Sequence, residues 1–174
     1  MMNDPQIGPE KALFALFDKA GIAHETREHQ AIFTVEEGQE IKAEMPGGHT
    51  KNLFLKDKSG QYVLISALAA TPIRLNQCHK ILNTKRLSFG KEEALFDLLG
   101  VRPGSVTLFS VVNDVKDDVR LVLDKALFEH ERVWFHPLRN TASTAIYTSD
   151  IINFAKAAGH EPTIVDFHAL LESG

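Results

Sequence analysis

The sequence predicts an α+β fold, in which helices pack on one mixed, largely antiparallel sheet. Three observations support this class. Helix-like and strand-like patterns alternate irregularly along the chain, without the strict β-α-β order of a doubly wound sheet. Short apolar stretches are joined by turn-forming residues, as in hairpins. The length of 174 residues and the hydrophobic content of 44% are typical of one globular domain, so we expect residues 1–174 to form a single domain.

The chain is expected to begin with a helix, a strand and a second helix. The first helix is predicted over 9–21, because Pro9 stands near its start, apolar residues recur at helical spacing and Gly21 ends it. Residues 22–28 read as a strand. The stretch Thr34-Val35-Glu36-Glu37 is a capping-box pattern and predicts a helix that continues to about Ala43.

A hairpin over 45–66 is the centre of the sequence. Residues 45–50 form a turn containing a proline and two glycines, and an apolar strand follows. A second turn at 57–60 leads into another apolar strand at 61–66. Lys51 and Asn52 stand where the first turn meets the strand, so they are held rigidly and can face a cleft. The alternative is a hairpin whose lysine is only solvated.

The remaining elements are read from the same signals. Turns are expected at 101–105 and, as a helical turn, at 125–129. Helices are predicted at 72–82 with Leu75, Cys78 and Leu82 facing inward, at 91–99 ended by Gly100, and at 149–158 opened by Ser149. Strands are predicted at 87–89, 106–112, 119–123, 132–135, 140–147 and 162–167.

Composition bears on the compartment. No apolar run approaches the ~20 residues of a membrane helix, and the N-terminus lacks the basic-then-apolar order of a signal peptide. Cys78 is the only cysteine, so no internal disulfide can form. These features predict a cytoplasmic protein without a membrane partner.

Charge is distributed unevenly along the chain. The net charge is −4, yet residues 45–91 carry eight basic side chains and one acidic side chain, Asp57, which leaves −11 for the rest. The basic residues are Lys51, Lys56, Lys58, Arg74, Lys80, Lys85, Arg86 and Lys91. Such asymmetry suits an anionic ligand docked at one place, although a solvated basic face would look the same.

Several common kinds of site are not supported. The stretch 47–52 does not match a phosphate-binding P-loop, because Lys-Ser/Thr does not follow the second glycine. The histidine spacings fit no short helical ligand pair. Cys78 falls on an apolar helix face, and no serine has a Gly-x-Ser-x-Gly setting. We therefore expect a site without metal, cofactor or protein nucleophile.

The stretch Pro-Gly-Gly-His-Thr-Lys-Asn-Leu-Phe-Leu at 46–55 resembles the signature of bacterial prolyl-tRNA editing proteins. These are free-standing relatives, in the YbaK-like group, of the editing domain inserted in bacterial prolyl-tRNA synthetases. Residues 100–107 resemble the family's Gly-x-x-Pro-Gly-Ser-Val-Thr loop, and 135–141 are similar to its His-Pro-x-x-Asn-Thr segment. Residues 85–89 match less specifically. The similarity spans about 29–167, with departures at Leu108 and Ser143.

The resemblance implies an α+β editing domain that hydrolyses alanine wrongly esterified to proline tRNA. Mischarged tRNA would be its partner, with prolyl-tRNA synthetase as a second one. Lys51 would stabilise the oxyanion or grip a phosphate or carbonyl, and Asn52 would orient the substrate. His136 would position water or the ribose, or would only cap a turn; the ribose hydroxyl itself could assist. The implied substrate-binding residues are Gly47, Gly48, His49, Thr50, Gly100, Pro103, Gly104, Ser105, Asn140 and Thr141, with backbone N–H groups of 100–105 holding the carbonyl oxygen.

Two alternatives stay open. One is a deacylase for cysteinyl-tRNA or for tRNA carrying another small amino acid. The other is a non-catalytic module that binds tRNA or a synthetase. An editing function has a physical motive, because a proline pocket rejects the smaller alanine by only ~1–3 kcal/mol per missing methylene.

Overall fold

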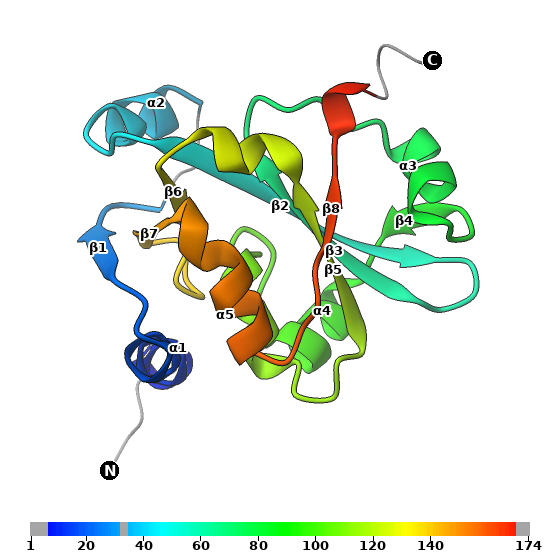
Figure 1. Cartoon of the computed structure of the whole chain (residues 1–174), viewed down its shortest axis with the longest axis horizontal. Coiled ribbons are helices and arrows are strands. Elements are labelled where there is room, and N and C mark those ends of the chain that lie inside the picture. The colour runs from blue at the N-terminus through cyan, green and yellow to red at the C-terminus, as the bar shows by residue number, and fades with distance from the viewer. Residues whose placement is uncertain (1–6, 32–34, 170–174) are drawn as a thin grey trace.

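The computed structural model describes residues 7–31 and 35–169, and within them the chain is a single α+β domain (Figure 1). The helices are α1 (Ile7–Ala20), α2 (Val35–Ala43), α3 (Leu75–Leu82), α4 (Glu92–Leu99) and α5 (Ile151–Ala157), with 3₁₀ turns η1 (Leu108–Asn113), η2 (Lys125–Glu129) and η3 (Thr148–Asp150). The strands are β1 (His24–Glu28), β2 (Gly48–Asp57), β3 (Tyr62–Leu68), β4 (Leu87–Phe89), β5 (Val119–Asp124), β6 (Arg132–Phe135), β7 (Ala142–Tyr147) and β8 (Thr163–Val165).

The strands form one mixed sheet in the order β1-β7-β6-β2-β3-β5-β8, and β4 pairs separately with β2. Of the pairings in the described chain, β1–β7, β7–β6, β2–β3 and β2–β4 are antiparallel. The pairs β2–β6, β3–β5 and β5–β8 are parallel. The predicted α+β class with a mixed, largely antiparallel sheet is therefore confirmed.

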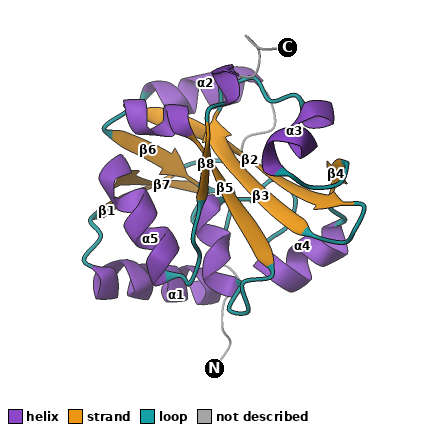
Figure 2. Cartoon of the chain, turned by 45° about the vertical axis from the view of Figure 1, so that its right-hand side comes forward, coloured by secondary structure: helices purple, strands orange, loops and turns teal. Residues whose placement is uncertain are grey.

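Each face of the sheet carries its own apolar core. On one face, called here the α1 face, the side chains of β2, β3, β5 and β6 pack against α1, α4, α5 and η1. α1 and α5 lie side by side on it (Figure 2). On the other face, called the α3 face, Leu55, Val63 and Ile65 pack against α3 and the segment around Phe167. Because side chains alternate along a strand, each residue of β2 belongs to one face or the other.

The central hairpin forms as predicted, but its first strand begins earlier than the sequence indicated. β2 starts at Gly48, because Gly48 and His49 pair with Val133 and Trp134 of β6. Lys51 is therefore the fourth residue of the strand, and not part of a turn-to-strand junction.

Asp57 organises the hairpin turn. Its carboxylate accepts hydrogen bonds from the Ser59 hydroxyl and from the backbone N–H groups of Ser59, Gln61 and Lys85. Burial opposes ionisation, but these four donors outweigh it and hold the pKa of Asp57 below its ordinary value. The single acid of the basic segment is thus a structural group.

Apart from shifts of one or two residues at strand ends, three other predictions differ from the structure. Residues 106–112 are not a strand: Thr107 accepts from the Phe109 N–H and Ser110 donates to the Thr107 carbonyl, which favours η1. Ser149 does not cap the last helix, since it lies in η3 and α5 begins at Ile151. α3 begins at Leu75 instead of Pro72. The proposed cap at Thr34 lies outside the described residues.

The inward orientation of Cys78 is confirmed. The side chain is buried in the α3-face core, and burial raises the pKa of its thiol. Among the described residues, no helix has the length and apolar character needed to cross a membrane.

Candidate functional site

The outer edge of β2 is open in its middle. β3 pairs with one edge of β2 along Thr50–Lys56. On the other edge β6 pairs at Gly48–His49 and β4 at Leu55–Asp57, and within the described chain no strand pairs between them. In Figure 1 this gap lies along β2 between the β6–β7 side and the β4–α3 side. Lys51 and Asn52 stand in the gap.

His136 directly follows β6, at the β6 end of this gap. β2 and β6 are parallel and pair at Gly48–Val133 and His49–Trp134, so Lys51 is two residues beyond the last pair on β2 and His136 two residues beyond it on the other chain segment, just past the end of β6. Thr50 Oγ1 donates a hydrogen bond to the Trp134 carbonyl at 2.7 Å, which holds β2 and β6 together at this point. By alternation the Lys51 side chain belongs to the α3 face, where it is half-buried opposite Ala67.

The ring of His136 has a defined tautomer when neutral. Its Nδ1 lies 2.9 Å from the Ala142 carbonyl, which only accepts, so Nδ1 carries the proton. Burial lowers the pKa of His136 from the ordinary 6.5, against the hydrogen bond to Ala142, which acts to raise it. The neutral ring therefore keeps the lone pair of Nε2 available to accept a proton or a hydrogen bond.

Asn52 faces the other side of the strand. Its Oδ1 and the hydroxyl of Ser66 are both buried, and neither has a hydrogen-bond partner in the described part of the chain. The two residues are directly opposite each other in the β2–β3 ladder. A buried polar atom without a partner costs about 1–3 kcal/mol, so such a pair marks a place prepared for a ligand or water. No motif or spacing in the sequence indicated Ser66.

The loop 100–105 meets the segment after β6. Gly100 ends α4 with φ 67°, and a side chain there would come within 2.8 Å of the Asn113 amide. Gly104 lies 3.7 Å from Asn140 Nδ2, measured from its ideal Cβ position. The predicted use of the loop's N–H groups is restricted, because Gly100 and Ser105 donate theirs to the carbonyls of Phe96 and Arg102. The Gly104 N–H has no protein acceptor in the described chain, and Pro103 has no N–H.

The segment after His136 is strained and firmly tied. Leu138 has φ 70°, which is uncommon for a branched residue. Arg139 donates two hydrogen bonds to Glu28, one to Glu10 and one to Thr141 Oγ1. A strained backbone held by such contacts is typical of functional sites.

The glycines and polar residues at the start of β2 make contacts within the protein. A side chain at Gly47 would come within 2.7 Å of the Arg132 carbonyl, and one at Gly48 within 3.0 Å of Leu68 and Val133. His49 Nε2 donates to the Met45 carbonyl at 2.8 Å. These residues fix β2 against β6 and so place Lys51; direct contact between them and a substrate stays a prediction.

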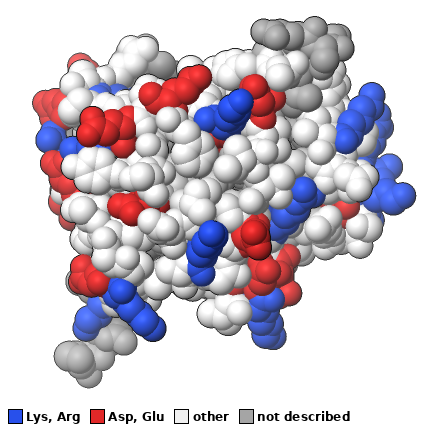
Figure 3. Space-filling model, viewed as in Figure 1, with Lys and Arg blue, Asp and Glu red and all other residues white. Residues whose placement is uncertain are grey.

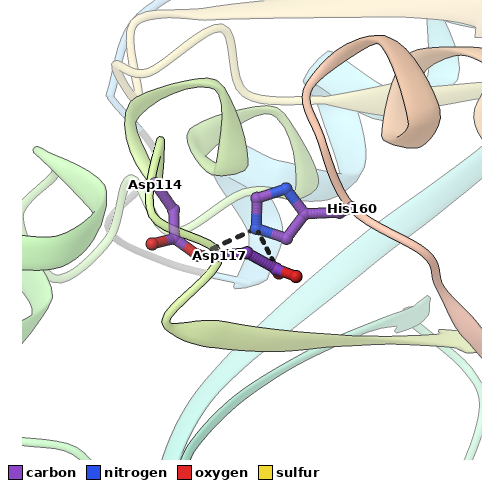
Figure 4. Close-up of side chains that lie close together, drawn as sticks. All are labelled: Asp114, Asp117 and His160. Carbon is purple, nitrogen blue, oxygen red and sulfur yellow. Dashed lines mark hydrogen bonds and ion pairs between the residues drawn. The ribbon is translucent and has the colours of Figure 1, made fainter.

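One group of metal-ligand type lies away from the gap. The buried His160 approaches Asp114 at 2.8 Å and Asp117 at 3.4 Å (Figure 4). Sequence spacing did not indicate it, because Asp114 and His160 are 46 residues apart. Asp114 also accepts from the N–H groups of Asp118 and Val119, and His160 Nδ1 faces the Ala158 carbonyl. These hydrogen bonds give the cluster a structural role in joining the η1–β5 and α5–β8 connections.

The basic segment contributes an exposed surface at one end of the molecule. Seven of its eight basic side chains are exposed, and Lys51 is half-buried. Figure 3 shows Lys and Arg atoms prevailing at the right-hand edge, where the β2–β3 hairpin lies in Figure 1.

The fold and the unpaired middle of the β2 edge describe the kind of protein this is: a single α+β domain with a lysine in an interrupted sheet edge and a buried histidine just after the strand that borders it. The model of the "Aminoacyl-tRNA editing domain" family matches residues 29–154. The chain is 40% identical over 151 residues to the mouse "Prolyl-tRNA synthetase associated domain-containing protein 1", covering 84% of this chain and 89% of that protein.

A bacterial relative supports the same family, and a solved structure supports the fold. "Prolyl-tRNA editing protein ProX" of Acetoanaerobium sticklandii is 32% identical over 152 residues, covering 87% of this chain and 93% of that protein. A crystal structure of a candidate trans-editing enzyme for prolyl tRNA synthetase superposes with a TM-score of 0.69 at 16% identity, covering 91% of this chain and 96% of that one. The chain therefore belongs to the aminoacyl-tRNA editing domain family, as its motifs indicated.

Proposed function

We propose that this chain is an aminoacyl-tRNA deacylase that removes alanine wrongly attached to proline tRNA, and that residues 1–174 act as one editing domain. The observation that carries the proposal is the unpaired middle of the β2 edge, which contains Lys51 and is bordered by β6, the strand that His136 directly follows. Membership of the family and the proline-related names of the relatives support the choice of tRNA. Mischarged tRNA is then the partner, and prolyl-tRNA synthetase, which would supply it, is a second proposed partner.

The site residues supply what ester hydrolysis requires. Water attacks the ester carbonyl carbon, and the carbonyl electron pair moves onto oxygen to form an oxyanion. The Lys51 ammonium group stabilises that charge, a contribution of ~10²–10³-fold in rate. His136 Nε2 accepts the proton of the water and returns it to the ribose oxygen when the carbon–oxygen bond breaks. Alanine and free tRNA are the products.

The opposite side of the strand holds the amino acid. The unpaired Asn52 Oδ1 and the Ser66 hydroxyl are oxygens that can accept from the substrate's α-ammonium group. The Gly104 N–H, which belongs to the loop 100–105, can donate a hydrogen bond to the carbonyl oxygen of the substrate. A pocket closed by packed strands would admit alanine and exclude the proline ring, because overpacking costs ~1–3 kcal/mol.

The test is a set of single-turnover rates on alanyl, prolyl, cysteinyl and seryl esters of the same proline tRNA. We expect alanyl-tRNA to be hydrolysed and prolyl-tRNA to be spared. Faster hydrolysis of the prolyl ester would refute the editing role, and preference for the cysteinyl ester would change the substrate. Binding of tRNA without hydrolysis of any ester would instead show a non-catalytic module.

A further inference from the structure

Phe89 is the most exposed aromatic side chain of the described residues, with 67% of its surface in water. It lies in β4, which is held against the outer edge of β2 by pairing from Leu55 to Asp57. The backbone after Phe89 is fixed against β2. Gly90 donates a hydrogen bond to the Phe54 carbonyl, and it packs so closely that a side chain at Gly90 would come within 2.4 Å of the Phe54 ring. A rigidly presented, exposed phenyl ring suggests a surface that a partner covers.

Phe89 is positioned at the rim of the open edge of β2. It is directly opposite Leu55, so its side chain is on the same α3 face as Lys51. Leu55 is four residues beyond Lys51, or ~13 Å along an extended strand. An ester held at Lys51 would therefore place the adjoining end of its nucleic acid near the Phe89 ring.

The surroundings of Phe89 are cationic. Lys85 and Arg86 precede it and Lys91 follows it, all exposed; Lys56, on the neighbouring strand, is exposed too but lies over the Tyr62 ring on the opposite face. None of these four forms an ion pair with a carboxylate of the described chain. The nearby Asp57 is turned inward and bound to backbone N–H groups.

We propose that Phe89 is a stacking platform for the unpaired bases at the 3′ end of the tRNA, with the flanking cations holding their phosphates. An aromatic ring among lysines and arginines is the arrangement that binds single-stranded nucleic acid. A protein partner fits less well, because lysine is depleted in the centres of protein interfaces. The inference rests on the proposed function, since it assumes that the ester lies at Lys51.

A direct test uses the variant Phe89→Trp and uncharged proline tRNA. The only native tryptophan, Trp134, is 2% exposed and serves as a constant background. We expect the fluorescence of the new indole to be quenched by intact tRNA and not by the same tRNA lacking its unpaired 3′ nucleotides. Equal quenching by both RNAs, or quenching by neither, would overturn the proposal. Because no ester is present, this result does not depend on catalysis.

Kinetics give a second measurement. Phe89→Leu should raise KM for alanyl-tRNA on the order of 10-fold with little change in kcat, and Phe89→Tyr should restore it. Phe96→Leu is the matched control, since Phe96 is also exposed but lies on α4 with Arg102 over its ring. An unchanged KM in Phe89→Leu would refute stacking even if the wild-type enzyme deacylates its substrate. Absence of wild-type deacylation would count against the proposed function, while the fluorescence test would still decide on stacking.

Discussion

Replacing Arg139 by methionine should destabilise the fold and loosen the site together. The Arg139 side chain is 16% exposed and donates to Glu10, which is 10% exposed, and to Glu28, which is 70% exposed. Leaving a fully buried charge unpaired costs about 3–5 kcal/mol. Glu28 can rehydrate and contributes below about 1 kcal/mol. Glu10 is buried but keeps 10% of its side chain in water, so we expect a loss of about 2–3 kcal/mol in total. For a domain of this size that lowers Tm by roughly 5–10 °C.

Thermal unfolding and deacylation rates of the same samples measure both effects. Arg102→Met is the matched control, because Arg102 is 68% exposed and only 3.9 Å from Glu92; it should change stability by less than about 0.5 kcal/mol. Arg139→Lys keeps the charge but loses the fork to Glu28, and should be intermediate. A Tm within about 2 °C of wild type for Arg139→Met would refute the reasoning.

The same contact has a pH signature. Hydrogen bonds from Arg139 lower the pKa of Glu28 from its ordinary 4.5. A lowered carboxyl pKa contributes stability that is present above the unfolded pKa and is lost as pH falls through the folded pKa. The stability difference between wild type and Arg139→Met should therefore shrink as the pH falls below about 4.5.

Four further outcomes are expected. Lys51→Ala should lower the single-turnover rate by ~10²-fold with an unchanged circular dichroism spectrum, and retention of more than about a tenth of the rate would contradict the oxyanion role. Asp57→Asn should cost about 1–3 kcal/mol in urea unfolding, because an amide N–H₂ would then face a backbone donor; no loss would mean that the turn forms without the carboxylate. The pH profile of kcat/KM should fall on the acid side with a pKa below 6.5, and disappearance of that limb in His136→Asn would assign it. Ser66→Ala should raise the stability by about 1 kcal/mol and lower the rate, and a rate equal to wild type would exclude Ser66 from the site.

The parts of the fold that the sequence predicted correctly depend on local signals. The hairpin, the end of α4 at Gly100 and the helical turn at 125–129 each follow from turn chemistry or periodicity within a few residues. η1 was missed because Val106, Val111 and Val112 suggested a strand. The outcome there depends on the side-chain hydrogen bonds of Thr107 and Ser110, which periodicity does not show.

The candidate site was predictable only in its parts. Arg139 reaches Glu10 across 129 positions of sequence, and the Ser66 hydroxyl belongs to the site only because the ladder places it opposite Asn52. The resemblance named Lys51, Asn52 and His136, but not their relative orientation. That orientation depends on the parallel register of β2 with β6, which spans more than eighty residues of chain.

Adjacent residues of a strand point to opposite faces, which makes a Lys-Asn pair within β2 an awkward basis for one site. In a fully paired sheet Lys51 would act on the α3 face and Asn52 on the α1 face, separated by the backbone. β6 ends at Phe135 and β4 pairs only from Leu55, so the edge of β2 is unpaired between them, and the proposed function requires the substrate to meet both side chains from this edge. The interruption of the sheet is therefore what would allow neighbouring residues to serve one substrate in the proposed function.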